Sequence, residues 1–309
     1  MALDATRIET NIRKLRKILK KSSKLLKPQD VHRLRTRTRR MEAILTAVGL
    51  SSDHSERQLL RRLGRIRKKA GKVRDMDVLT SHACAIKKMN AGCDCLLQLI
   101  EYLGAQRYRF ARKLRQSIQR HSPKTRRRLK RTSARLERII DHDQENSSDM
   151  QTDPHAQAAG LARKLSMDLA APAILNRSNL HSYRIKIKEL RYVLQTEKGD
   201  RDRQFMDALG ESKDAIGEWH DWEQMIAIAA ELLDHEPECT VLTTLRTISR
   251  EKYDLALSVT NRMREQYVKR NNSGKDRSFS HSWWSASRLG QKPSTLRRLS
   301  RRGRSLKPA

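Results

Sequence analysis

The stretch LHSYRIKIKELRY at residues 180–192 has the spacing of an amphipathic helix, and VHRLRTRTRRMEA at residues 31–43 repeats that spacing. In both stretches apolar side chains recur every three or four residues, which aligns them along one side of a helix. The matched seams continue just past the two stretches and are Leu180, Tyr183, Ile187, Leu190 and Leu194 in the later helix, and Val31, Leu34, Thr38, Met41 and Leu45 in the earlier one. We therefore predict two related helices that bury equivalent faces.

A second pair of blocks follows in the same order. LGRIRKKAGKVRDMDVL at 63–79 matches LGESKDAIGEWHDWEQM at 209–225, so that Gly64, Gly71 and Asp75 coincide with Gly210, Gly217 and Asp221. Two matched blocks in one order predict an internal duplication. We expect the four glycines to permit close helix packing, because neither the strand nor the GK[ST] ending of a phosphate-binding loop accompanies them.

The composition predicts an all-α fold. Only 4% of the 309 residues are aromatic, and Gly and Pro are few, whereas strands need aromatic and β-branched residues between frequent turns. Helical patterns are expected up to a stop near Pro28, then from a cap at Asp30, and over about 55–90 and 92–120. Pro123 is expected to open a short basic helix to about 140, and helical patterns resume over 157–176, 179–196, 200–233 and 237–269.

These patterns divide the chain into four parts. Residues 1–140 form a first helical half, and residues 157–269 form a second. The segment 141–156 (DHDQENSSDMQTDPHA) is acidic, Ser-rich and aperiodic, so we predict a linker. The tail 270–309 is polar and basic, and we expect it to be disordered. The sequence leaves open whether the Trp283-Trp284 pair in this tail is an interaction motif or docks on the body.

The charge is large and uneven. The net charge is +32, and residues 1–140 hold 39 basic but only 11 acidic side chains. With so large a net charge, the basic side chains repel one another in the folded protein, which favours a polyanionic partner: nucleic acid, polyphosphate or an anionic membrane surface. The chain contains no apolar run of the roughly 18 residues that a membrane span needs. Its first residues show no secretory signal.

No cofactor or metal site is expected. The four cysteines, Cys84, Cys93, Cys95 and Cys239, match neither a zinc spacing nor a CxxC redox pair. Reduced cytosolic thiols on helices account for them.

A basic stripe runs beside each apolar seam. His181, Arg184, Lys188 and Arg191 follow the spacing i, i+3, i+7, i+10, about 100° around the helix from the seam, where side chains are partly sheltered. The first half repeats the stripe with His32, Arg35 and Arg39, and adds Arg33, Arg37 and Arg40 nearby. Guanidinium groups suit phosphate because their planar donors bind two oxygens together. A single stripe would be an ordinary solvated face, but its recurrence favours a phosphate-binding role.

The second pair of blocks adds further candidates. Asp75 follows Arg74, and Asp221 follows His220. The two aspartates either form ordinary salt bridges on their helices or hold a stripe Arg or His in position, and the sequence leaves both open. His220 is a candidate ligand contact, and Arg74 is its counterpart.

Together these residues resemble a known family, the CHAD (conserved histidine α-helical) domain. The resemblance covers about residues 4–269 and rests on VHRLRTRTRR at 31–40, VRDMDVL at 73–79, LHSYRIKIKELRY at 180–192 and LG…HD at 209–221. It implies two pseudo-symmetric bundles of long helices with a basic groove or channel between them that binds polyphosphate. It also implies cytosolic proteins, often at polyphosphate granules and sometimes fused to a triphosphate-hydrolysing CYTH domain, for whose β-barrel this chain has no room.

The resemblance also implies binding residues. The family's basic and histidine positions fall on His32, Arg35, Arg39, Arg40, His181, Arg184, Lys188, Arg191 and His220. This chain departs from symmetry at three places: Glu189 stands opposite Arg40, Glu42 stands opposite Arg191, and Arg74 takes a histidine-like position.

The leading hypothesis is therefore a polyphosphate-binding protein that is not an enzyme. The first alternative is a nucleic-acid-binding protein that uses the basic first half and the Arg-rich tail, although an aromatic stacking platform and a helix-turn-helix signature are missing. The second is a phosphate-processing enzyme, which needs a positioned base, nucleophile or metal as well as cations. Asp75 and Asp77 diverge on one helix, so we do not expect them to share Mg²⁺. The third is a helical scaffold, which leaves the paired stripes unexplained.

Overall fold

The computed structural model describes residues 2–21, 27–89, 94–142, 153–198, 202–233 and 240–269. Within these ranges the named elements are all helical, and they include no strand, which confirms the predicted all-α fold. They are α1 (Ala5–Lys21), α2 (Pro28–Ala47), the 3₁₀ turn η1 (Leu50–Ser52), α3 (His54–Met89), α4 (Asp94–His142), α5 (Pro154–Ala170), α6 (Leu180–Leu194), α7 (Arg203–Leu232), α8 (Thr240–Met263) and the π-helix η2 (Arg264–Lys269).

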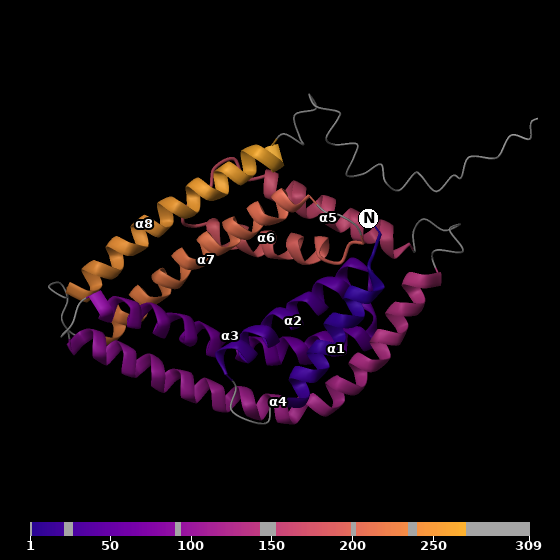
Figure 1. Ribbon diagram of the computed structural model, residues 1–309, viewed down its shortest axis with the longest axis horizontal. Helices are drawn as coiled ribbons and strands as arrows, with labels where there is room; N and C mark the ends of the chain where they lie inside the picture. The colour runs from indigo at the N-terminus through magenta and orange to yellow at the C-terminus, as the bar shows by residue number, and fades with distance from the viewer. Residues whose placement is uncertain are drawn as a thin grey trace, which may run out of the picture.

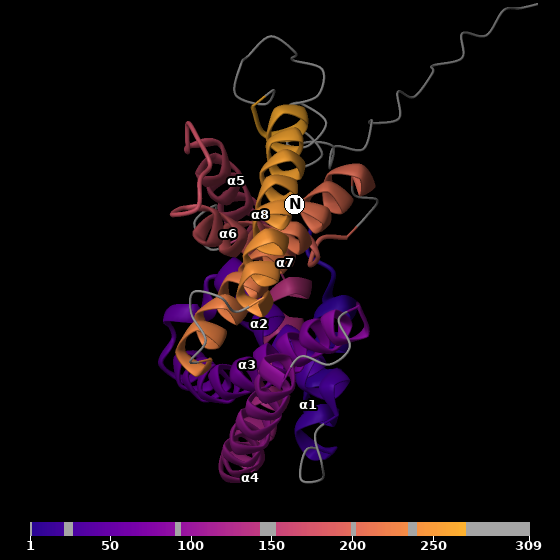
Figure 2. The same ribbon diagram turned by 90° about the vertical axis from the view of Figure 1, so that its left-hand side faces the viewer.

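The helices form two bundles with the same order of packing (Figures 1 and 2). In the first bundle α1 packs on α2, α2 on α3, and α3 on α4; in the second, α5 packs on α6, α6 on α7, and α7 on α8. The bundles meet where α2 contacts α6, where α3 contacts α7, and where α5 contacts α2 and α4. Helices α2, α3, α6 and α7 are the two pairs matched in the sequence, so the duplicated segments face each other across the junction.

The apolar seams explain this arrangement. All ten seam residues of α2 and α6 are buried, and Val31, Leu34, Leu45, Leu180 and Ile187 are fully inaccessible. Burying each such side chain contributes about 1.5–3 kcal/mol relative to exposure. The main core cluster contains residues from both bundles, so the bundles share one interior rather than standing as separate domains.

Helix α4 differs from the expectation. Pro123 lies inside one continuous helix and does not open a new one, so that expectation was wrong. A proline inside a helix removes one backbone hydrogen bond and favours a bend, and Figure 1 shows α4 curving around the first bundle. Ser122 is buried beside the proline and donates a hydrogen bond to the backbone oxygen of Leu19 in α1, 2.8 Å away. Tertiary packing therefore holds α4 together through its proline.

Two helix starts also differ. Helix α2 begins at Pro28, whose missing N–H is not needed in a first turn, so Asp30 lies within the first turn rather than at the cap. Helix α5 begins at Pro154, three residues before the expected 157, because the Asp153 side chain accepts hydrogen bonds from the backbone N–H groups of His155 and Ala156 at 2.7 and 3.1 Å.

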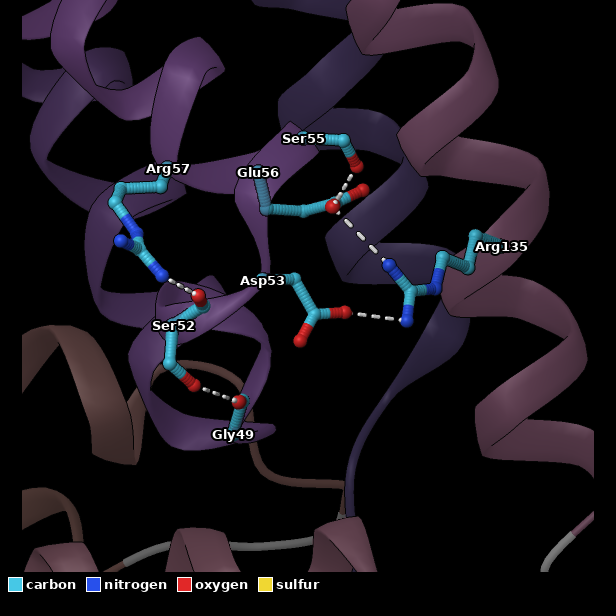
Figure 3. A network of polar contacts seen from close by, with 7 residues as sticks. All are labelled: Gly49, Ser52, Asp53, Ser55, Glu56, Arg57 and Arg135. Carbon is cyan, nitrogen blue, oxygen red and sulfur yellow. Dashed lines mark hydrogen bonds and ion pairs between the residues drawn. The ribbon is translucent and has the colours of Figure 1, made fainter.

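A polar network fastens the start of α3 to α4 (Figure 3). Arg135 of α4 contacts Asp53 Oδ2 through Nη2 at 2.5 Å and Glu56 Oε2 through Nη1 at 3.1 Å. Ser55 donates to the Glu56 carboxylate, and Arg57 donates to the backbone oxygen of Ser52. Glu56 is only 3% exposed, so Arg135 supplies the charge that makes its burial tolerable.

Some expectations fall outside the described residues. These are the core of the predicted linker (143–152), the tail 270–309 and its Trp283-Trp284 pair. None of the helices in the described ranges is long and apolar enough to cross a membrane. Cys84 is a free, exposed thiol.

Candidate functional site

A cavity of about 720 Å³ lies where α2 and α3 of the first bundle meet α6 and α7 of the second. Every basic or histidine position that the family resemblance implies lines it, and so do Arg74 and both predicted aspartates, whereas the neighbouring Arg33 and Arg37 do not. The predicted residues that line it are His32, Arg35, Arg39, Arg40, Arg74, Asp75, His181, Arg184, Lys188, Arg191, His220 and Asp221. All of them except His32 are only partly exposed, as expected for a stripe next to a buried seam. The fold thus brings the two predicted stripes to one place; that they bind a ligand remains a prediction.

The cavity has an excess of unpaired cations. Among the described residues its lining includes eight Arg and Lys side chains against four carboxylates. Arg35 pairs with Asp75, and Lys213 pairs with Asp214. The other six form no ion pair with a carboxylate of the described ranges: Arg39, Arg40, Arg74, Arg184, Lys188 and Arg191. Cations held close together and partly away from water repel one another, so an anion in the cavity would relieve a standing cost.

Two buried guanidinium donors in the lining also have no hydrogen-bond partner within the described part of the chain. They are Nε of Arg40 and Nε of Arg191, and the buried Nδ1 of His181 has no partner there either. A buried polar group without a partner costs roughly 1–3 kcal/mol, and more when it is charged. Oxygen-rich anions such as phosphate supply acceptors of the kind these donors need.

The electrostatic effect is largest at Lys188. Burial, together with the neighbouring cations Arg184, Arg35 and Arg39, lowers the pKa of Lys188 to about 7. Its amino group is therefore only about half protonated near neutral pH, whereas the amino group of a lysine in water is almost fully protonated there. All four of these residues lie on the predicted stripes, two from each bundle.

Two histidines stack in the cavity. The ring centroids of His181 and His220 are 4.1 Å apart, and His220 Nε2 lies 3.3 Å from Gln224 Nε2. Burial, followed by the influence of His181 and Arg184, lowers the pKa of His220 to about 4. Both rings are neutral at pH 7, because burial and nearby cations lower the pKa of His181 as well. The sequence suggested His220 as a contact, and the fold places it against the stripe histidine of α6.

The predicted aspartates differ in their contacts. Arg35 Nη1 donates to Asp75 Oδ1 at 3.0 Å, which is the contact expected if Asp75 positions a stripe arginine. Burial raises the pKa of Asp221 to about 6, against the opposing effect of Arg184. Asp77 accepts a hydrogen bond from Arg107 of α4 at 2.5 Å and does not line the cavity. Asp75 and Asp77 therefore diverge, as their spacing predicts.

The glycines of α7 make room for arginines of α6. A Cβ atom on Gly217 would lie 2.3 Å from Nη2 of Arg184, and one on Gly210 would lie 3.3 Å from Nη2 of Arg191. Their counterparts Gly64 and Gly71 have nothing within 4 Å of such an atom. Close packing was expected at all four glycines, but it occurs only in the second half, and there against the guanidinium groups of the site.

Sequence reasoning missed several residues of the cavity. Lys213 aligns with Arg67 at the offset that relates the second pair of blocks, so the duplication could have identified it. In the first bundle both terminal nitrogens of Arg67 donate to the carboxylate of Glu42. In the second bundle Lys213 stands for Arg67 and Arg191 stands for Glu42, so two cations occupy the equivalent positions, and both line the cavity. His82 also lines the cavity, but it aligns with an isoleucine, and no sequence signal identifies it.

A comparison with protein families places the chain in one of them. The family model of the CHAD domain matches residues 9–230, which is well over half of the chain. A search of the curated proteins found no match. In the described ranges, no three His, Cys, Asp or Glu residues come together in a group that could hold a metal ion.

Proposed function

The chain belongs to the CHAD domain family, and from this premise we propose that it binds inorganic polyphosphate in the cavity between its two bundles. The family is associated with polyphosphate binding, and its domains generally bind rather than catalyse. The observation that carries the proposal is the group of six unpaired, half-buried cations that two separate bundles contribute to one cavity.

The chemistry of the cavity suits a linear phosphate chain. Guanidinium groups from α2 (Arg39, Arg40) and α6 (Arg184, Arg191) surround the same space, so successive phosphates of one chain have donors on either side. Lys188 adds a point charge, and His181 adds a ring donor. A bound polyanion would raise the lowered pKa values of Lys188, His181 and His220, so that binding would favour their protonated, positively charged forms.

Nucleic acid fits the cavity less well. Base stacking needs aromatic faces, and among the described residues of the lining the only aromatic rings are Tyr192 and four histidines, two of which contact each other. We propose binding without catalysis, because Asp75 is bonded to Arg35 and Asp77 is bonded to Arg107 of α4, so these two carboxylates cannot act together. Release of phosphate by the purified protein would contradict this part of the proposal.

The direct test removes two cations from each bundle. The variant Arg35→Ala, Arg39→Ala, Arg184→Ala, Lys188→Ala should lose polyphosphate binding, because half of the eight cations in the lining are gone. Circular dichroism should show unchanged helicity, since none of the four side chains is part of the buried core. A control with Arg163→Ala, Lys164→Ala, Arg250→Ala and Arg262→Ala removes the same charge from exposed positions outside the cavity. Wild-type affinity in the cavity variant would show that the site is wrongly assigned.

Association with polyphosphate granules in the cytosol belongs to the same proposal and rests on the family resemblance. The Arg-rich tail is proposed as a separate, non-specific contact for nucleic acid.

A further inference from the structure

The outer edge of α4 carries a second row of cations. Six exposed side chains lie within one sector of the helix, opposite its buried face: Arg109, Arg112, Arg120, Lys124, Arg127 and Arg131. We call them the outer stripe. Their intervals of three, eight, four, three and four residues keep them aligned over 22 residues, or roughly 33 Å of helix. None of them lines the cavity between the bundles.

The outer stripe is not neutralised within the described part of the chain. None of its six residues forms an ion pair there, whereas Arg107 and Arg135 on the same helix pair with carboxylates of Asp77 and Glu56. Its flank is also basic: burial lowers the pKa of His121, and the nearby charges of Arg120 on α4 and Arg65 on α3 lower it further. Like charges accumulate along this edge without compensation.

The fold itself does not require such a stripe. Helix α8 holds the equivalent place in the second bundle, where it packs on α7 as α4 packs on α3. The exposed side of α8 mixes Arg250 with the acidic residues Glu251 and Asp254 and the apolar Leu255. Solubility of an outer helix is therefore achieved there with mixed charges, whereas the outer stripe of α4 is uniformly basic, which favours a polyanionic ligand.

The shape of the edge discriminates between polyanions. Pro123 lies inside α4, where a proline favours a bend, and Figure 1 shows that α4 is curved, with its convex side away from the bundles. Duplex DNA is stiff over about 50 nm, so it would touch a convex edge only over a short length. Single-stranded nucleic acid binds through stacked aromatic rings, and Tyr108 is the only aromatic among the exposed large hydrophobic residues of the described ranges. A flexible chain of phosphates without bases meets neither obstacle.

We propose that the outer stripe is a second polyphosphate-binding surface, so that one molecule joins two chains, or two distant parts of one chain. The inference rests on the proposed function of the cavity, because it assigns the same ligand to both places. Two surfaces for one polymer turn a binding protein into a cross-linker, whose avidity for long chains exceeds that of either surface alone.

A bridging assay with the full-length protein tests this proposal. Biotinylated long-chain polyphosphate is immobilised, protein is added, and capture of a second, fluorescent long-chain polyphosphate is measured. The variant Arg112→Gln, Arg120→Gln, Lys124→Gln, Arg127→Gln removes most of the outer stripe. The matched control Arg163→Gln, Lys164→Gln, Arg250→Gln, Arg262→Gln removes equal charge from exposed positions of the second bundle.

We expect the wild type and the matched control to capture the second polyphosphate chain. Capture by the outer-stripe variant should be at least tenfold lower. The outer-stripe variant should still bind short polyphosphate with wild-type affinity, because the cavity is intact. Undiminished bridging by this variant would overturn the inference, as would displacement of polyphosphate from the stripe by duplex DNA at equal phosphate concentration. A wrong assignment of the cavity would be detected separately: the variant Arg35→Ala, Arg39→Ala, Arg184→Ala, Lys188→Ala would then bind short polyphosphate with the affinity of the wild type.

Discussion

At the scale of single residues, Lys188 carries the strongest electrostatic effect among the cations of the cavity. Four cations that depress one another's charged forms are unfavourable in an empty protein, and the local core would be more stable without them. Their arrangement makes sense when a polyanion supplies the missing negative charge. The protein would then have exchanged some stability of its free form for a site that is already assembled.

The depressed pKa of Lys188 predicts pH-dependent binding. With a pKa of about 7 in the free protein, Lys188 loses its charge as the pH rises from 7 to 9, whereas bound polyphosphate would hold the proton in place. Affinity should therefore fall with rising pH in this window, by at most about tenfold per pH unit. Titrations with short polyphosphate at pH 7, 8 and 9 measure this dependence.

The control is Lys188→Arg, whose guanidinium stays protonated throughout the range. This variant should show a much flatter profile, while any titration of the phosphate ends affects both proteins equally. Identical pH profiles for wild type and Lys188→Arg would contradict the role given to Lys188.

The same pKa affects the free protein. Because the pKa of Lys188 is lower when folded than when unfolded, the unfolded chain binds more protons between pH 7 and 10.5, and stability rises with pH across that window. Asp221 has the opposite effect at acid pH. Because its pKa is about 6 in the folded protein and 3.8 in the unfolded chain, the folded protein binds more protons between these values, and stability falls as the pH rises from 3.8 to 6.

At the scale of helices, the sequence predicted the elements that build the site. Helices α2 and α6 were predictable because a period of three to four residues fixes which face is buried, and the adjacent stripe then follows from helix geometry. Lys213 was accessible only through the duplication, and His82 was not accessible at all, since its place depends on how α3 packs against α7. The continuity of α4 through Pro123 was also unpredictable, because local propensity argues for a break and tertiary contacts such as that of Ser122 override it.

The packing of α7 against α6 predicts an unusual effect of glycine replacement. Gly217→Ala should weaken polyphosphate binding by about tenfold, roughly the 1.4 kcal/mol expected for displacing one charged hydrogen-bonding group, because the new methyl group would displace the Arg184 guanidinium. Arg184 is also held by a hydrogen bond from Nε to the backbone oxygen of Lys213 at 3.1 Å, so it cannot move without losing that contact.

The matched control is Gly71→Ala at the equivalent position of α3, where the new methyl group meets nothing within 4 Å. This variant should raise the free energy of unfolding by about 0.5–1 kcal/mol through helix propensity and leave binding unchanged. Equal affinities for Gly217→Ala and wild type would show that the position of Arg184 does not matter.

At the scale of the whole molecule, the duplication produces a site that neither half contains alone. The two bundles are not equivalent: Glu42 neutralises Arg67 in the first, while Arg191 and Lys213 both line the cavity from the second. The second bundle therefore contributes more cations to the cavity at these positions, although the first half of the chain carries most of the basic residues. Many of those lie on the outer face of α4. Overall charge therefore does not report the composition of the site, which only the fold reveals.

The claim that both bundles grip one phosphate chain is tested most directly by the salt dependence of binding. Three variants are compared with wild type in titrations with short polyphosphate at several salt concentrations: Arg35→Ala with Arg39→Ala, Arg184→Ala with Lys188→Ala, and all four together. Each cation that contacts the chain displaces counterions, so the slope of log K against log salt reports the number of contacts. We predict that each double variant flattens the slope by about one to two, and that the quadruple variant flattens it by about the sum. A slope that changes for one bundle and stays at the wild-type value for the other would contradict a shared site.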